Sequence, residues 1–328
     1  MKIIRKILWK AYRIFVFKPY AMVSFIWPVW YYYVNRKSRQ LFKLNPPKLN
    51  DIQNRIVSDL KKDGIAIAHI DELFPGKNIL EKLQAYTNPI LKTAEAKTRK
   101  TFLEYLWEPI PIVEARNPFA NAALDNRVMD IVNSYIGVFS RLVSLILNVT
   151  APSEGQKARS SQRWHRDSDD KKICKMFIYV SDVSKENGPF IYLLGSQYGG
   201  KLRKLFPQWP PAGSVPERGA VEKKVAPEDI KVCLGKAGTV IFADTSGLHQ
   251  GGYGPSGKRV MFTAAYYAGD MFKFPKPRYT LAPEFLPEFE ASNPSKAVRY
   301  AISEKEPRLF KKFHHAVKKI LNPKILKL

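Results

Sequence analysis

Apolar and polar positions alternate in short runs through the middle of the chain, and these runs are rich in β-branched and aromatic residues. Turns that contain Gly, Pro, Asn or Asp separate them, which is typical of β-strands. Strands are predicted at residues 142–149, 175–180, 238–243 and 260–267. Many short strands between such turns favour two antiparallel sheets. The pattern therefore predicts a mainly β domain with flanking helices (α+β), built as a double-stranded β-helix or cupin-like jelly-roll barrel.

Helical periodicity precedes these strands. Gly64 and Gly137 stand where two amphipathic patterns end, as expected of helix stops. The spacing predicts helices at 51–63, 77–97 and 124–135, and a short strand at 65–70.

One long segment interrupts the β pattern. Residues 199–227 are charged and rich in Pro and Gly, which predicts a long loop over the mouth of the barrel. Two interpretations of this loop stay open, substrate selection and a mobile surface insertion.

The two ends of the chain have a different composition. No acidic residue precedes Asp51, and the first fifty residues carry eleven Lys or Arg. Residues 19–34 are apolar and aromatic, but they are shorter than the stretch of about twenty residues that spans a bilayer, and Pro28 interrupts them. Such aromatic residues favour the membrane interface, and no signal-peptide cleavage pattern follows. Residues 308–320 predict a basic amphipathic helix.

Net charge completes this picture, because the chain carries a formal charge of +25. Basic, amphipathic ends predict docking on an anionic membrane surface, and two cysteines in apolar surroundings predict buried thiols in a reducing compartment. We therefore expect a cytoplasmic protein that is peripherally associated with a membrane. In a second interpretation, the aromatic segment packs on the barrel. Nucleic acid ranks below a membrane, since no nucleic-acid module is recognisable, and the sequence has no signal for oligomeric state.

Three units follow from these patterns. They are a basic, aromatic membrane-associating segment at residues 1–50, a catalytic jelly-roll domain with N-terminal helices at 51–270, and a basic extension at 271–328 with an amphipathic helix.

A possible metal site lies at the edges of the predicted strands. His165 and Asp167 are two residues apart on an extended segment, so both side chains point to the same side. His249 follows a later strand, at Thr245-Ser-Gly-Leu-His-Gln-Gly-Gly252. Two histidines and one carboxylate on one face of an octahedral ion leave other positions open, which is typical of non-haem Fe(II) oxygenases.

Arg259 opens the next apolar run, ten residues after His249. A guanidinium inside a barrel needs a carboxylate partner and can bind one in bidentate fashion. The far carboxylate of 2-oxoglutarate would fit, if its keto-acid end chelates the iron. Pairing with a structural acid or exposure to solvent is the alternative for Arg259.

The ordered motifs resemble the phytanoyl-CoA dioxygenase family of Fe(II)- and 2-oxoglutarate-dependent oxygenases over roughly residues 55–270. They are Trp164-His-Arg-Asp167, Glu186-Asn-Gly-Pro-Phe190, Leu194-Gly-Ser-Gln197, Lys236-Ala-Gly-Thr-Val-Ile-Phe242, His249-Gln-Gly-Gly252 and Arg259. The segment at 194–198 lacks the usual proline and histidine, and Gly251 stands where some relatives have a cosubstrate-binding hydroxyl.

The resemblance implies an iron-dependent dioxygenase with 2-oxoglutarate and O2 as cosubstrates. Its metal and catalytic residues would be His165, Asp167 and His249, with Arg259 binding the cosubstrate. Because Asp167 is present, it implies hydroxylation of a C–H bond of a small or lipid-like substrate and not halogenation. Two alternatives stay open, a non-catalytic membrane-associated jelly-roll binding or scaffold protein, and a barrel enzyme that uses another divalent metal such as zinc or manganese.

Overall fold

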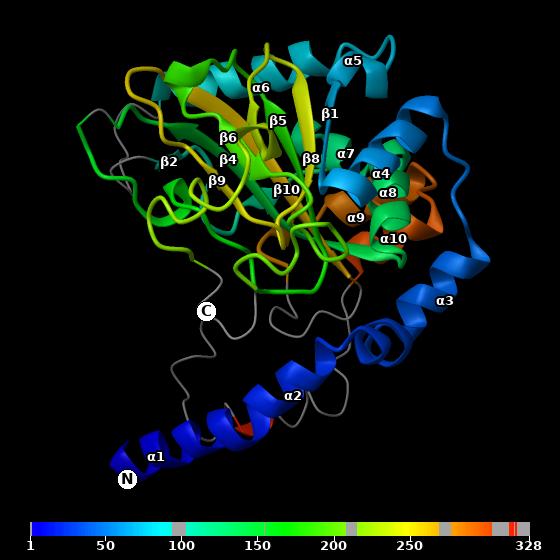
Figure 1. Ribbon diagram of the computed structural model, residues 1–328. Helices are drawn as coiled ribbons and strands as arrows, with labels where there is room; N and C mark the ends of the chain where they lie inside the picture. Colours follow the sequence, from blue (N-terminus) through cyan, green and yellow to red (C-terminus); the bar gives the residue numbers. More distant parts are fainter. Residues whose placement is uncertain are drawn as a thin grey trace.

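Two antiparallel sheets face each other at the centre of the molecule (Figure 1). A computed structural model describes residues 2–93, 103–153, 155–207, 215–268, 277–303, 315–317 and 319. The larger sheet has the strand order β1-β8-β5-β10-β4-β2 and the smaller has the order β7-β6-β9. Their bounds are β1 Ile65–His69, β2 Leu103–Tyr105, β4 Ser140–Thr150, β5 Ile173–Tyr179, β6 Phe190–Leu193, β7 Ile230–Cys233, β8 Thr239–Asp244, β9 His249–Gly251 and β10 Arg259–Ala268.

Strand alternation gives the larger sheet two different faces. On β5, Met176 and Ile178 pack in the cluster beneath the helices, whereas Phe177 and Tyr179 pack in the cluster between the sheets. Phe190 and Tyr192 of β6 join that second cluster. The inner face of the larger sheet and the smaller sheet therefore enclose a common interior. This confirms the mainly β jelly-roll prediction.

Helices cover the outer face of the larger sheet (Figure 1), where α4 contacts β1, and α8 and α10 contact β4. Capping residues set their ends. Asn50 and Gln53 form a capping box at the start of α4, and Gly64 ends this helix with a φ of 79°. The helices are α3 Arg36–Leu44, α4 Asp51–Asp63, α5 Ile70–Leu73, α6 Ile79–Thr93, α7 Pro118–Leu124, α8 Asn126–Ile136, α9 Phe285–Ala291 and α10 Lys296–Ile302.

The predicted elements and the observed ones differ most before β4. The helix expected at 124–135 begins at residue 126, and a separate helix, α7, precedes it. Asp125 causes the break, because its backbone is extended and its carboxylate accepts a hydrogen bond from the Arg127 N–H at the start of α8. The helix expected at 77–97 is described to Thr93.

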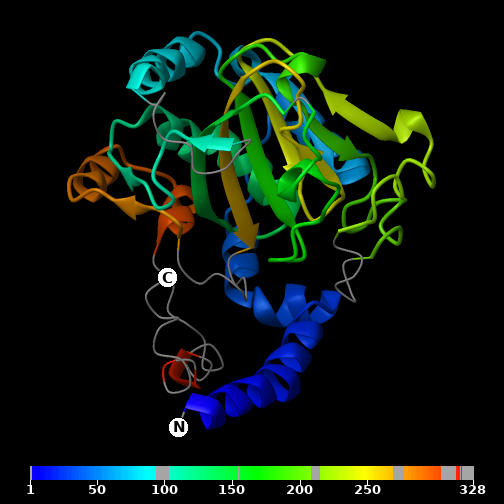
Figure 2. The same cartoon turned by 90° about the vertical axis from the view of Figure 1, so that its left-hand side faces the viewer.

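An N-terminal arm, which we define as residues 2–34, lies beneath the sheets in both views (Figures 1 and 2). It contains α1 Lys2–Tyr12, α2 Lys18–Ser24 and two π-helical turns, Arg13–Phe17 and Val29–Val34. Trp30 anchors the arm, since its indole is buried and donates to Asp170 at 2.7 Å. No helix in the described part of the chain has both the length and the apolar character needed to cross a bilayer.

The segment after β10 also contacts the domain. β11 (Thr280–Leu281) pairs with β3 (Ile112–Val113), and α10 packs against α8 and β4. The amphipathic helix predicted at 308–320 falls mostly outside the described residues, of which 315–317 and 319 are helical.

Candidate metal centre

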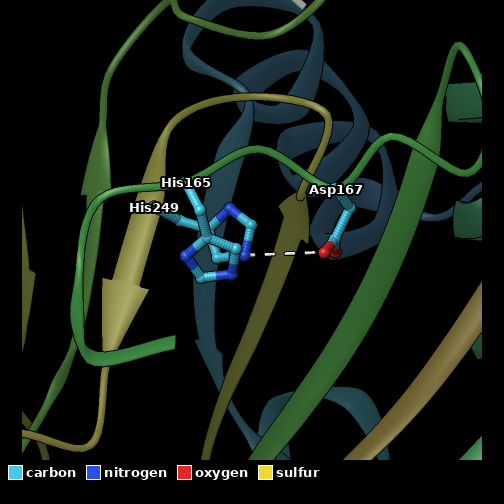
Figure 3. Close-up of side chains that lie close together, drawn as sticks. All are labelled: His165, Asp167 and His249. Atoms are coloured by element: carbon cyan, nitrogen blue, oxygen red, sulfur yellow. Dashed lines mark ion pairs between the residues drawn. The ribbon is translucent and has the colours of Figure 1, made fainter. Parts of the chain in front are cut away.

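The two predicted histidines meet at the edge of the interior. His165, which precedes β5, and His249, which begins β9, exchange backbone hydrogen bonds at 2.9 and 3.0 Å. Their rings lie side by side, 4.1 Å between centroids, with Asp167 facing them (Figure 3). One ligand atom from each of the three residues falls within 4.8 Å of the others. The tertiary fold therefore brings His249 together with ligands that lie 82 and 84 residues before it in the chain.

Backbone carbonyls fix both imidazoles. The Nδ1 atom of His165 lies 2.8 Å from the Arg163 carbonyl, and that of His249 lies 3.0 Å from the Gly247 carbonyl. A carbonyl oxygen can only accept, so each Nδ1 carries the proton and each Nε2 keeps its lone pair. Such contacts orient metal-binding histidines in known sites.

Charge at the centre also suits a cation. Burial and the neighbouring His165 lower the pKa of His249 to about 3, so its ring stays neutral at pH 7. Burial raises the pKa of Asp167, but Lys175 and the two histidines outweigh it and bring the pKa below its ordinary value. A neutral imidazole and an ionised carboxylate are the forms that bind a divalent metal.

Arg259 lies 2% exposed at the first position of β10. Its Nη2 donates to the Thr150 hydroxyl at 3.1 Å, and its guanidinium faces the Tyr179 ring at 5.9 Å. Its Nε and Nη1 are buried and have no hydrogen-bond partner among the described residues. Burial lowers the pKa of Arg259. The Tyr179 hydroxyl opposes that effect, but no described carboxylate does. The alternative in which Arg259 pairs with a structural acid therefore has no support in the described chain.

Sequence reasoning gave no role to Lys175, yet its ammonium lies 2.6 Å from the Asp167 carboxylate. Strand alternation could have indicated it, because a lone lysine on β5 shares the inner face with Phe177 and Tyr179.

Arg166, between the two ligands, points the other way and donates to the carbonyls of Ser196, Ser246, Leu205 and Phe206. It thereby ties the long loop to the segment that holds the ligands.

One comparison with known proteins identifies a family. The sequence matches the phytanoyl-CoA dioxygenase (PhyH) family over residues 82–260, which is more than half of the 328 residues. A search of curated proteins finds no match.

Similar solved structures include three enzymes. EctD from S. alaskensis with bound Fe has 18% identity and a TM-score of 0.48, covering 74% of this chain and 86% of its own. The α-ketoglutarate-dependent epimerase SnoN from nogalamycin biosynthesis has 14% identity and a TM-score of 0.47, covering 69% and 86%. HygX from Streptomyces hygroscopicus, with nickel, 2-oxoglutarate and hygromycin B, has 17% identity and a TM-score of 0.45, covering 66% and 87%.

The family match, joined to a two-histidine, one-carboxylate cluster, shows that this chain belongs to the phytanoyl-CoA dioxygenase family of Fe(II)- and 2-oxoglutarate-dependent oxygenases.

Proposed function

We propose that His165, Asp167 and His249 hold Fe(II), and that Arg259 binds the far carboxylate of 2-oxoglutarate. The observation that carries this proposal is the buried guanidinium of Arg259, with two nitrogens that lack a partner in the described chain. A buried, unpaired charge is costly, whereas a dicarboxylate cosubstrate would supply a bidentate partner.

The order of groups along the interior supports this assignment. Arg259 begins β10, and Tyr267, which lies close enough to Asp167 to feel its charge, is near the end of that strand. Phe177 and Phe190 lie between these levels, with tilted rings whose centroids are 4.6 Å apart, and the Phe190 ring lies 5.7 Å from the His249 ring. A cosubstrate that joins the metal to Arg259 would occupy the Arg259 side, which leaves the side near the end of β10 for the substrate.

That side has an apolar wall suited to a hydrocarbon. Val143, Ile173, Ala265 and Tyr267 form a separate buried cluster there, and burial of such surface favours apolar ligands. When bound, iron, 2-oxoglutarate and O2 supply an oxidant that converts a C–H bond to C–OH, with succinate and CO2 as the other products. The protein's own residues orient the reactants and exclude water. We infer hydroxylation of a small or lipid-like substrate.

We further propose that the arm rests on an anionic membrane surface. It carries six Lys or Arg and no acidic residue, and each nearby cation contributes about 1 kcal/mol on such a surface. Large apolar side chains are exposed along it, including Ile4, Ile7, Leu8, Phe15, Met22, Val23 and Ile26. Trp30 nevertheless packs on the domain. Packing on the domain therefore applies to Trp30, and membrane contact is proposed for the exposed residues of the arm. The protein would then be cytoplasmic and peripherally bound, with units at 1–50, 51–270 and 271–328.

The test of the metal and cosubstrate assignment is an anaerobic titration of the full chain with Fe(II) and then 2-oxoglutarate. A chelated keto acid gives a weak visible charge-transfer band, which we expect in the natural protein. His165→Ala should abolish the band, and His69→Ala, which removes a histidine outside the cluster, should not. The assignment would be contradicted if His165→Ala kept the band, or if the iron-loaded natural protein gave no band.

A further inference from the structure

A cavity of about 510 Å³ lies between the arm and the domain. The arm lines it with Met22, Phe25 and Ile26, and the domain lines it mainly with Arg166, Lys171, Tyr198, Arg203, Lys204 and Pro207. We call it the arm cavity. Its position is fixed by contacts on both sides: Trp27 stacks on Tyr198 at 5.3 Å between ring centroids, and the Lys171 ammonium donates to the Phe25 carbonyl at 2.5 Å.

The domain side of the arm cavity is cationic. Lys171, Arg203 and Lys204 form no ion pair with a described acid, and no acidic residue lines the cavity. Arg166 differs from Arg203 and Lys204, because backbone carbonyls already take up its guanidinium donors. Lys171 lies between these cases, since its ammonium donates to the Phe25 carbonyl and lies 3.9 Å from the centroid of the Tyr198 ring. Burial lowers the pKa of Lys171 to about 8, although Asp170 opposes the effect, and an anion beside the ammonium would favour its charged form further.

The arm side of the cavity is apolar, and it continues onto open surface. Met22 is 56% exposed and Ile26 is 53% exposed. A site with three cations that form no ion pair with a described acid on one wall, and open hydrocarbon on the other, matches a ligand that has both an anionic group and apolar chains. A nucleic acid or a free phosphate would use the cations but not the apolar wall.

We propose that the arm cavity binds the phosphate headgroup of one anionic phospholipid in a bilayer, with the acyl chains against Met22 and Ile26. Lys171, Arg203 and Lys204 would contact the phosphate. This inference rests on the proposed function only in that the arm meets a membrane, and it needs neither iron nor turnover.

The site has a consequence for the reaction. Lys171 lies four residues after Asp167 and two before β5 begins. Because β5 and β10 are antiparallel, with Ile173 paired to Tyr267, the arm cavity lies at the end of the sheet where the proposed substrate wall is found. A bound headgroup would hold that end of the domain against the lipid surface.

The experiment compares binding of the full-length variants to vesicles of phosphatidylcholine alone and with phosphatidylglycerol, by sedimentation. Arg203→Gln with Lys204→Gln removes two exposed charges from the cavity. Lys185→Gln with Lys258→Gln is the matched control, because these two charges lie at the opposite end of the sheet. Lys258 directly precedes β10, and the side-chain amide of Asn187, two residues after Lys185, donates to its carbonyl. Met22→Ser with Ile26→Ser removes the apolar wall at exposed positions, so folding is unaffected.

We expect binding to the anionic vesicles to weaken about 30-fold in the charge variant, which corresponds to about 1 kcal/mol for each of two charges. Binding of the control should weaken less than about 3-fold, because salt screens charges that lie far from the bilayer. Binding of the apolar variant should weaken about 10-fold, the effect of two lost apolar contacts. Inorganic phosphate at millimolar concentration should not release the protein.

Three results would overturn the proposal. Equal weakening in the control would show that net charge alone matters. Unchanged binding of the apolar variant would indicate a polyanion surface, of the kind that also binds nucleic acid. Release by inorganic phosphate would make free phosphate the ligand. The iron and 2-oxoglutarate band, measured on each variant, should stay unchanged, so a failure of the catalytic assignment is seen separately.

Discussion

At the scale of single residues, Lys175 and Arg259 both face the interior, but only Lys175 forms an ion pair with a carboxylate. Lys175 lies 2.6 Å from Asp167, whereas Arg259 has no acidic partner among the described residues. A paired charge stabilises the metal-free protein and an unpaired one costs stability until a ligand arrives. The two residues therefore predict opposite responses to substitution.

Replacing Arg259 with Gln should weaken 2-oxoglutarate binding about 30- to 150-fold, since a bidentate, buried charge pair is worth about 2–3 kcal/mol. The same change should raise the free energy of unfolding of the ligand-free protein by about 1 kcal/mol, because a desolvated charge disappears. The charge-transfer band reports the first effect and denaturant titration the second. Arg259→Lys, which keeps the charge and loses the fork, should bind 2-oxoglutarate with intermediate affinity, and natural affinity in the Gln variant would refute this role.

Replacing Lys175 with Met should lower the free energy of unfolding of the metal-free protein by about 2 kcal/mol, because Asp167 loses its partner. Saturating Co(II) should remove most of the difference, since the metal then neutralises Asp167. Thermal unfolding with and without metal measures both states. The control is Lys231→Met, an exposed position on β7, and a deficit that persists at saturating metal would show that Lys175 acts by packing alone.

At the scale of elements, local capping sets the ends of the helices, and burial then shifts the pKa of acidic side chains on them. Asp125 caps α8, and Asp130 lies half-buried one turn further along. Burial is the main cause that raises the pKa of Asp130 to about 6, and the charge of Asp125 is the second cause. The folded protein therefore binds this proton more tightly than the unfolded chain does.

A pH dependence follows for α8. The contribution of Asp130 is favourable below its unfolded pKa, near 4, and is lost as the pH rises through about 6. Asp130→Asn should thus raise the free energy of unfolding at pH 7.5 by about 1 kcal/mol, a value reduced for partial exposure, and should change it little at pH 4. Denaturant titrations at the two pH values test this. Asp59→Asn, on α4, where the side chain is 42% exposed, should stay within about 0.5 kcal/mol at both pH values.

At the scale of the whole molecule, the described contacts that join the arm to the domain core lie towards its end, at residues 25–31. Trp30 and Trp27 pack on the domain, whereas α1 contacts the π-helical turn that follows it. Residues 2–17 should therefore contribute to membrane binding and little to the stability of the domain.

Deletion of residues 2–17 should leave the melting temperature within about 2 °C of the natural value, because the arm residues that pack on the domain core, Trp27, Trp30 and Tyr31, all lie after them. Binding to phosphatidylglycerol vesicles should fall steeply, since the deletion removes five of the arm's six cations. Scanning calorimetry and vesicle sedimentation measure the two effects. A large loss of thermal stability would show that this part of the arm belongs to the folded domain.

The sequence by itself determined the main strands of the larger sheet, the helices at 51–63 and from 77 onward, the capping glycines and the identity of the candidate ligands, because each depends on nearest neighbours or on spacing within one segment. It could not place Lys175 beside Asp167, leave Arg259 without an acid or set Trp30 against Asp170, since these pairings join segments 8 to 140 residues apart. Only the tertiary structure decided them. Which buried charge meets a partner depends on how strands from distant parts of the chain share one interior, and that geometry is a property of the packed sheets.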